Sequence, residues 1–315
     1  MGRISWATLY AAVALACAVP AAATTYVAED VPRSQHINDL GQVGLLDINN
    51  SGHLAGYNAV GSLGGSNDYN GINELDQTVG TSFVPGIGRA HAALWTGGAI
   101  TDLGALAADG GSFASAINDA GVIVGGADAT APGVFVWAVY WSGGVIHKLD
   151  DLGSNISYAN DVNNAGVIVG ESTYAPFSFR AVAWTGGVLQ DLGTLGGDFS
   201  AAFAVNELGQ IVGNASPVAG PSHGFIWEGG SMQDLSTLTL NLSDGEYIGE
   251  AWDINESGQI LATIRGPDNA FRTVILTPVP EPGGWALLIL GFGGAGAGLR
   301  IARRSAKTPL ASAVG

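Results

Sequence analysis

Cysteine is almost absent from this sequence of 315 residues, and charged side chains are scarce. The single cysteine, Cys17, lies in an apolar N-terminal stretch. The rest of the chain therefore has no thiols for a disulfide framework, a cysteine-ligated zinc site or a cysteine nucleophile. Charged residues make up 12%, about half the usual share, which excludes a charge-rich disordered protein and favours a packed core.

Basic residues are the scarcer charged type between the two ends of the chain. Residues 24–279 contain 26 acidic and 6 basic side chains, a net charge of −20. Proteins that bind nucleic acids present a basic patch or stripe to the phosphate backbone. A nucleic acid is therefore excluded as a partner.

Patterns typical of catalysis or tight metal binding are also missing. The five histidines never stand at a ligand spacing, and no serine–histidine–aspartate set, phosphate-binding glycine loop or close carboxylate pair can be singled out. Asp47–Gly52 and Asp253–Gly258 match the start of a calcium loop, but Asn58 and Ile264 replace the bidentate glutamate. We expect no enzyme, no cofactor and at most weak binding of divalent cations at the acidic surface.

The first 23 residues are predicted to be a secretory signal peptide. Arg3 supplies the positive start, residues 4–19 are apolar, and small residues, Ala21 and Ala23, stand where signal peptidase cleaves. An uncleaved membrane anchor is the alternative. We expect export of the chain, with cleavage after Ala23.

A second apolar segment, Trp285–Ala302, lies near the C-terminus. Its 18 residues reach about 27 Å as a helix, which is just enough to span a bilayer. Arg300, Arg303 and Arg304 place this end in the cytoplasm by the positive-inside rule. A buried core helix is the alternative, but its many glycines disfavour a helix in water. We therefore predict a transmembrane helix over 285–302.

The motif Pro280-Glu281-Pro282 directly precedes this apolar segment. In order and spacing, the proline motif, Trp285, the apolar stretch and the arginine cluster resemble the PEP-CTERM sorting signal of Gram-negative bacteria. The resemblance implies that residues 279–307 are a sorting segment in which an exosortase recognises Pro280-Glu281-Pro282 and processes the protein near this motif. The tail of residues 308–315 is not typical of such signals. The expected location is the membrane before processing, and the cell surface or the extracellular space afterwards.

Residues 24–278 between these segments are built from repeats. One repeated unit has the form Asn-x-x-x-x-x-(aliphatic)-Gly, with a glycine or alanine at the end and, in five of six copies, a glycine at the fourth position. The copies begin at Asn49, Asn73, Asn118, Asn163, Asn206 and Asn255. A glycine at the fourth position is typical of a type I turn that ends in a left-handed residue.

A second repeated unit has tryptophan followed two residues later by a glycine pair. Its copies are Trp95–Gly98, Trp141–Gly144, Trp184–Gly187 and Trp227–Gly230. Each predicts a tight hairpin, because glycine enters positive-φ turns without steric cost. The tryptophans stand among aliphatic residues at one fixed place, so we expect core packing between repeats and not stacking against sugars.

Four short strands in about 45 residues are typical of a β-propeller blade, and a β-solenoid or a stacked array of hairpins is the alternative. We predict an all-β, propeller-like ring of five or six four-stranded blades. Residues 25–31 and 270–276 are expected to complete one blade together. The short interval between Asn49 and Asn73 predicts one degenerate blade.

The repeats resemble the HAF family of extracellular repeats, through His91-Ala92-Ala93, His223-Gly224-Phe225 and the best copy, Asp191–Ala202. This resemblance implies architecture and location but no activity. The sequence predicts an exported, non-enzymatic surface or matrix protein of a bacterium that makes exopolysaccharide, a candidate partner. The alternative is a glycan-binding or glycan-degrading propeller, lyase or hydrolase, which a polar cluster on the strands that face the channel would favour.

Overall fold

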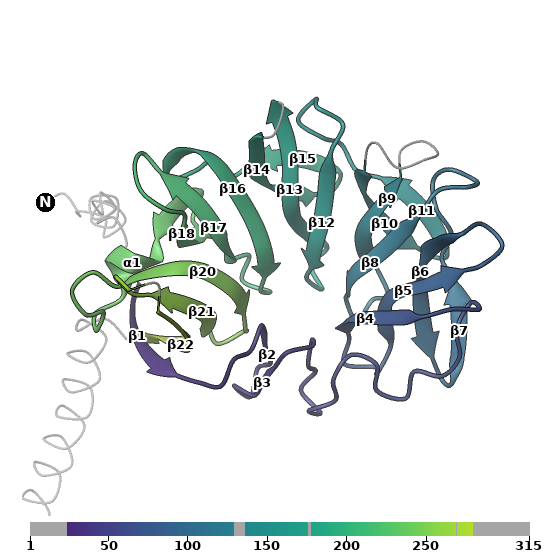
Figure 1. The fold of residues 1–315 in the computed structure, drawn as a ribbon, viewed down its shortest axis with the longest axis horizontal. Helices are drawn as coiled ribbons and strands as arrows, with labels where there is room; N and C mark the ends of the chain where they lie inside the picture. Colours follow the sequence, from purple (N-terminus) through teal and green to yellow (C-terminus); the bar gives the residue numbers. More distant parts are fainter. Residues whose placement is uncertain (1–23, 129–135, 176–177, 269, 280–315) are drawn as a thin grey trace, which may run out of the picture. The chain divides into compact units, whose positions relative to one another are not determined.

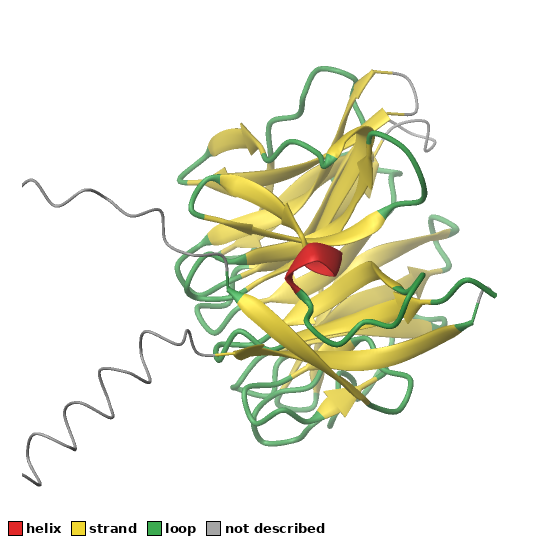
Figure 2. Ribbon diagram, turned by 90° about the vertical axis from the view of Figure 1, so that its left-hand side faces the viewer, coloured by secondary structure: helices red, strands yellow, loops and turns green. Residues whose placement is uncertain are grey.

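The computed structural model describes residues 24–128, 136–175, 178–268 and 270–279. Residues 26–278 form one compact unit in which the β-sheets are arranged as a ring (Figure 1). Residues from several sheets line cavities in the middle of this ring, which we call the channel. Five sheets have four strands and one has two, and every recorded strand pair is antiparallel. The predicted all-β, propeller-like architecture is therefore confirmed. The described residues contain one helix, α1 (Leu235–Leu238), which is a single turn (Figure 2). No helix within these residues is long and apolar enough to cross a membrane.

Four of the four-stranded sheets are formed by consecutive strands. They contain β4 (Asn67–Ile72), β5 (Thr78–Val84), β6 (Arg89–Thr96) and β7 (Ala99–Asp102); β8 (Ser112–Ile117), β9 (Ile123–Asp128), β10 (Val136–Ser142) and β11 (Val145–Lys148); β12 (Ser157–Val162), β13 (Val167–Ala175), β14 (Ser178–Thr185) and β15 (Val188–Asp191); β16 (Gly196–Val205), β17 (Ile211–Pro217), β18 (His223–Glu228) and β19 (Ser231–Asp234). In each sheet the first strand is the one that faces the channel (Figure 1).

The fifth four-stranded sheet joins the two ends of the domain. It has the order β1 (Thr25–Asp30), β22 (Phe271–Val279), β21 (Ile260–Arg265) and β20 (Tyr247–Ile254). The predicted sharing of one blade by the two ends is thus confirmed. Beyond the sheet, the amide of Val31 donates to the carbonyl of Thr273 at 3.0 Å.

Two short units fill the ring between this sheet and β4. One is the two-stranded sheet of β2 (His36–Ile37) and β3 (Val43–Gly44), and the other is a turn closed by a single bridge between Ile48 and Leu54. The predicted count of five or six blades must therefore be refined. The described chain has five complete blades, and two short hairpin units complete the ring.

The glycine-rich turns have the predicted conformations. Gly97 and Gly98, between β6 and β7, both have positive φ, at 58° and 79°, as a type I′ hairpin requires. At the asparagine turns, Asn118 accepts a hydrogen bond from Gly121, whose φ is 76°. An added Cβ at Gly97 or Gly121 would meet open space, so backbone conformation and not crowding selects glycine there.

The core lies between neighbouring sheets. One cluster joins Val79 and Ala92 of the β4–β7 sheet to Ala114 and Trp141 of the β8–β11 sheet. Of the four repeated tryptophans, Trp95, Trp141 and Trp184 are at most 2% exposed, which confirms their predicted place in the core. The fourth, Trp227, is partly buried and packs against the edge of a core cluster. Each of the three buried indoles donates to a carbonyl of the preceding unit; for Trp184 the acceptor is Asp150, at 2.8 Å. Sheet-to-sheet packing therefore uses both apolar area and an indole hydrogen bond.

Candidate functional site

Seven asparagines form a closed ring of hydrogen bonds at one mouth of the channel. In each unit the asparagine Nδ2 donates to the backbone carbonyl of the asparagine in the next unit, at 2.9–3.2 Å. The order is Asn38, Asn49, Asn73, Asn118, Asn163, Asn206, Asn255 and back to Asn38. All seven are at most 5% exposed. This asparagine ring links every unit to the next, including the two short ones.

The asparagine side chains also hold their own turns. Each Oδ1 accepts the amide of the residue four positions later, for example Val122 on Asn118 at 2.9 Å. Six of these turns are the predicted repeat copies, and the seventh, at Asn38, was missed. The stretch from Asn38 to Gly44 is one residue shorter than the repeat, but its Asn-x-x-Gly-Gln start is identical to that of Asn206 and Asn255.

A second ring lies just outside the first. The amide of each residue that follows a ring asparagine donates to the side-chain oxygen of its counterpart in the next unit, at 2.6–2.9 Å. These residues are Asp39, Asn50, Glu74, Asp119, Asn164, Glu207 and Glu256. They line a cavity of about 200 Å³, which we call the acidic mouth. Burial raises the pKa of Glu256, and the charges of Asp39 and Glu207 add to the effect.

Four charged side chains converge inside the channel, two residues before the ring asparagines. His36, Asp47, Asp161 and Asp253 line a cavity of about 80 Å³ and form what we call the channel cluster. The Nδ1 atom of His36 is 3.6 Å from Asp253 Oδ2 and 3.8 Å from Asp47 Oδ1. A polar cluster on channel-facing strands is the feature that the sequence associates with a glycan-acting enzyme.

The three carboxylates of this cluster are occupied by backbone amides. Asp161 accepts Val162 on one oxygen and Val205, of the next unit, on the other, at 2.8 and 2.9 Å. Asp47 and Asp253 do the same with their own and the following units. Each carboxylate therefore acts as a clamp between two consecutive units of the ring.

Charge interactions shift the protonation of the channel cluster. Burial lowers the pKa of His36, but hydrogen bonding and attraction to Asp253, together with the charge of Asp47, outweigh burial and raise it to about 9. Burial raises the pKa of Asp161 to about 7, since its backbone hydrogen bonds offset only part of the cost and Asp253 and Asp47 repel its charge. Near neutral pH the histidine is a cation among carboxylates.

The structure places the predicted calcium-loop segments in hairpin turns. Asp47 and Asp253 point into the channel and hold backbone amides, and no group of three or more histidine, cysteine, aspartate or glutamate side chains in the described ranges is arranged to hold a metal ion. This agrees with their interpretation as turns.

The histidines of the HAF-like step belong to a repeated side-chain pair with an aspartate. His91 Nδ1 is 2.8 Å from Asp102 Oδ1, and His223 Nδ1 is 2.6 Å from Asp234 Oδ2. Arg180 replaces the histidine in the β12–β15 sheet, 3.9 Å from Asp191. The pairs connect the third and fourth strands of a sheet, which is a structural role.

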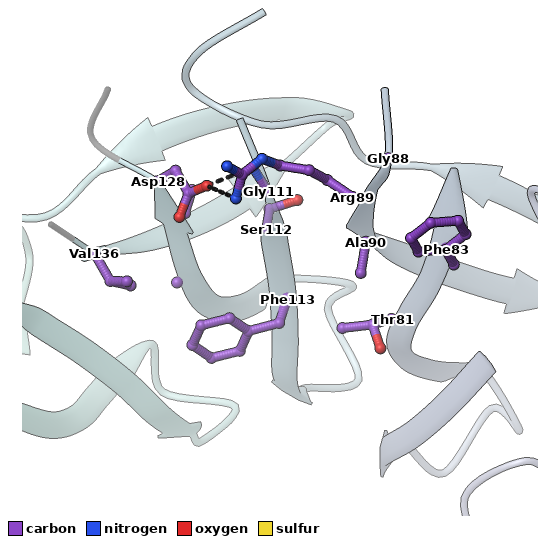
Figure 3. A pocket seen from close by; sticks show the side chains of 12 residues that line it. Thr81, Phe83, Gly88, Arg89, Ala90, Gly111, Ser112, Phe113, Asp128 and Val136 are labelled. Atoms are coloured by element: carbon purple, nitrogen blue, oxygen red, sulfur yellow. Dashed lines mark hydrogen bonds and ion pairs between the residues drawn. The ribbon is translucent and has the colours of Figure 1, made fainter. Parts of the chain in front are cut away.

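A groove of about 370 Å³ opens between the β4–β7 and β8–β11 sheets (Figure 3). Arg89 and Asp128 form an ion pair at 3.2 Å in the groove, and the amide of Gly111 donates to Asp128 Oδ2 at 2.8 Å. Phe83 and Phe113 contribute phenyl rings from the two sheets. We call this the rim groove. The sequence analysis did not single out any of its residues.

The predicted targeting residues lie outside the described residues. They are the cleavage positions Ala21 and Ala23, the sorting residues Pro280, Glu281, Pro282, Trp285, Arg300, Arg303 and Arg304, and the proposed transmembrane helix 285–302.

Neither a family model nor a curated protein matches this chain. Among solved structures, the fold is similar to that of TolB from Acinetobacter baumannii, with a TM-score of 0.39 and 14% sequence identity. The match covers 69% of this chain and 55% of TolB, so the chain spans about half the length of that protein.

Proposed function

We propose that this protein is an exported, non-enzymatic propeller that an exosortase sorts to the surface or the extracellular matrix of a Gram-negative bacterium. The sequences of the two ends support export and sorting, through the signal peptide ending at Ala23 and the motif Pro280-Glu281-Pro282. In this proposal the acidic propeller is exposed at the cell surface or in the matrix, where exopolysaccharide surrounds it.

The observation that supports a non-catalytic role is the use made of the channel carboxylates. A general acid or nucleophile needs a carboxyl oxygen free to reach a substrate. Asp47, Asp161 and Asp253 each accept amides on both oxygens, and half of these amides come from the next unit. These hydrogen bonds between consecutive units support a structural role for the three carboxylates.

A glycan-degrading enzyme is the second candidate, and it has one observation in its favour. Asp161, with a pKa of about 7, lies in the same narrow cavity as His36, and perturbed pKa values in a cleft are common at catalytic sites. Turnover of polysaccharides by the purified protein, abolished by Asp161→Asn, would establish the enzyme. We expect no turnover above a blank.

Sorting is tested by the fate of the C-terminal segment. In the producing bacterium, protein released from the surface should lack peptides from residues 285–304 by mass spectrometry. Glu281→Ala should hold the protein in the membrane fraction, whereas Asp244→Ala, an exposed carboxylate in a loop of the domain, should not. Released protein that retains these peptides, or normal release of Glu281→Ala, would overturn the proposal.

A further inference from the structure

The rim groove exists because one blade departs from the repeat. In the four sheets of consecutive strands, the residue five positions before the ring asparagine pairs with the second strand in the same way: Asp68 with Thr81, Phe113 with Gly126, Tyr158 with Glu171, and Ala201 with Asn214. Gly126 is the one member of the second-strand set without a side chain. Gly111 likewise stands seven residues before its ring asparagine, where the next two sheets have Ile156 and Phe199.

These two glycines make room for a phenyl ring and a cavity. A Cβ added at Gly126 would lie 2.5 Å from Cζ of Phe113, so this ring rests directly on the backbone of β9. The ring also lines the groove, as does Phe83 of the neighbouring sheet, which is 37% exposed. The groove therefore has apolar, aromatic surface on both sheets (Figure 3).

The ion pair supplies hydrogen-bonding capacity beside the rings. Asp128 Oδ2 accepts both Arg89 Nη1 and the amide of Gly111. Among the described residues, Asp128 Oδ1 and the Nε and Nη2 groups of Arg89 have no hydrogen-bond partner. Within the described ranges, an acceptor and donors that bond no other protein group thus stand next to each other. Neighbouring hydroxyl groups of a sugar suit such a pair, since each hydroxyl both donates and accepts.

We propose that the rim groove binds a unit of a neutral polysaccharide. Pyranose rings present an apolar face to Phe113 or Phe83 and hydroxyls to Arg89 and Asp128. The volume of about 370 Å³ lies in the range of small-ligand sites, which is about 300–1,000 Å³. The net charge of −20 in residues 24–279 disfavours an anionic ligand, and a charged ligand would compete with the ion pair. This inference rests on the proposed function, because it gives the displayed propeller its ligand.

The test is calorimetric titration of the purified full-length protein, in detergent, with neutral tetrasaccharides of glucose, galactose and mannose and with tetragalacturonate as the charged counterpart. We expect at least one neutral tetrasaccharide to bind and tetragalacturonate to bind at least tenfold more weakly. No binding of any neutral probe, or equal binding of the charged one, would overturn the inference.

Matched variants locate the site. Phe113→Ala and Asp128→Asn should weaken binding at least tenfold, and Phe83→Ala, at a position that is 37% exposed, should weaken it at least threefold. Phe271→Ala removes a phenyl group that is 61% exposed on another sheet, and Glu250→Gln alters another carboxylate paired with an arginine; both should bind within twofold of the unaltered protein. The reverse pattern would place the site elsewhere and contradict the proposal.

The two proposals fail separately. Because titration of purified protein does not depend on export, normal release of the protein without tetrasaccharide binding would overturn the ligand and leave sorting intact. Binding by a protein that the cell does not sort would overturn the proposed function and leave the groove intact.

Discussion

The two ends of strand β8 show how the repeat is used. Just beyond its last residue lies Asn118, whose counterparts are asparagine in all seven units and whose side chain contacts the next unit. Near its first residue lies Phe113, whose counterparts are aspartate, tyrosine and alanine in the other three sheets of consecutive strands. The residue is therefore the same in every unit at the asparagine position, and it differs from sheet to sheet at the position of Phe113. The uniform end therefore closes the ring, and the varied end is free to form a site.

The two short units support the same conclusion. Between Asn38 and Leu54 the chain has no outer strands, yet it retains two ring asparagines and their turns. The loop that follows also replaces a strand, since the carbonyl of Gly61 accepts the indole of Trp95 at 3.2 Å. Closure of the ring thus needs the asparagine turn and not a whole blade.

The largest effect should come from the apolar packing between neighbouring sheets, which lies between the uniform and the varied ends of the strands. Trp184→Ala removes a fully buried indole and its hydrogen bond to Asp150, and we expect it to lower the free energy of unfolding by about 3–5 kcal/mol in urea titrations. Trp252→Ala, at a partly exposed position in the channel, should cost less. Equal losses of unfolding free energy in the two variants would show that the buried indole contributes no more to stability than a partly exposed one.

Breaking the asparagine ring should have the next largest effect. Asn163→Ala leaves the Val167 amide without its partner and removes one of the two hydrogen bonds that the Asn206 carbonyl accepts, so we expect a loss of about 2–4 kcal/mol in the free energy of unfolding. The exposed neighbour Asn164→Ala should cost about 0.5–1 kcal/mol, although it also bonds across units. A smaller cost for Asn163 than for Asn164 would contradict the importance of the inner ring.

At the varied end, Glu171→Gln should stabilise the protein in a pH-dependent way. Burial raises the pKa of Glu171 to about 7, above its ordinary 4.5, so the folded state holds a proton that the unfolded state releases. Its contribution to stability therefore falls as pH rises from about 4.5 to 7. The variant should gain about 1–2 kcal/mol at pH 8 and nothing at pH 4, as urea titrations at both values would show. A gain at pH 4 would contradict this cause.

The channel cluster should also make the folded protein less stable as the pH rises. The folded pKa of His36 is about 9 against 6.5 when unfolded, so its stabilisation is complete below pH 6.5 and disappears as pH rises through 9. Melting temperatures of the unaltered protein should fall between pH 6.5 and 9, and His36→Gln should flatten this decline. If the melting temperature of His36→Gln fell with pH as steeply as that of the unaltered protein, His36 would not be the cause of the decline.

The smallest effect is expected in the rim groove. Phe83→Ala alters a partly exposed side chain, so the free energy of unfolding should stay within about 0.5 kcal/mol of the unaltered protein. Thermal melts would check this. A loss above 2 kcal/mol would show that the rim supports the fold as much as the asparagine ring does.

The turns were predictable because their rules are local. An Asn-x-x-Gly step and a glycine pair select positive φ within a few residues, and the sequence marks both. Asn38 was missed because its unit lacks one residue of the repeat. That Asn163 reaches the Asn206 carbonyl, 43 residues away, could not be predicted, since a local pattern cannot show which units become neighbours in space.

The site was less predictable for a related reason. Asp47 and Asp253 were noted as the first residues of segments that match the start of a calcium loop, and Asp161 was not singled out. The convergence of the three carboxylates depends on the closed ring. The signal for the rim groove was present as Gly126, a glycine where the aligned residues carry side chains. This glycine can be interpreted only once the strand register is known, because the register places it opposite Phe113.

Native-state hydrogen exchange tests the central claim, a ring closed by seven equivalent asparagine turns, most directly. The amides to follow are those bonded to the asparagine Oδ1 atoms: Gln42, His53, Gln77, Val122, Val167, Gln210 and Gln259. If the ring is one cooperative unit, Gln42 and His53 of the short units will exchange as slowly as the other five, through global unfolding. Exchange of Gln42 and His53 orders of magnitude faster than that of the other five would contradict the closed ring.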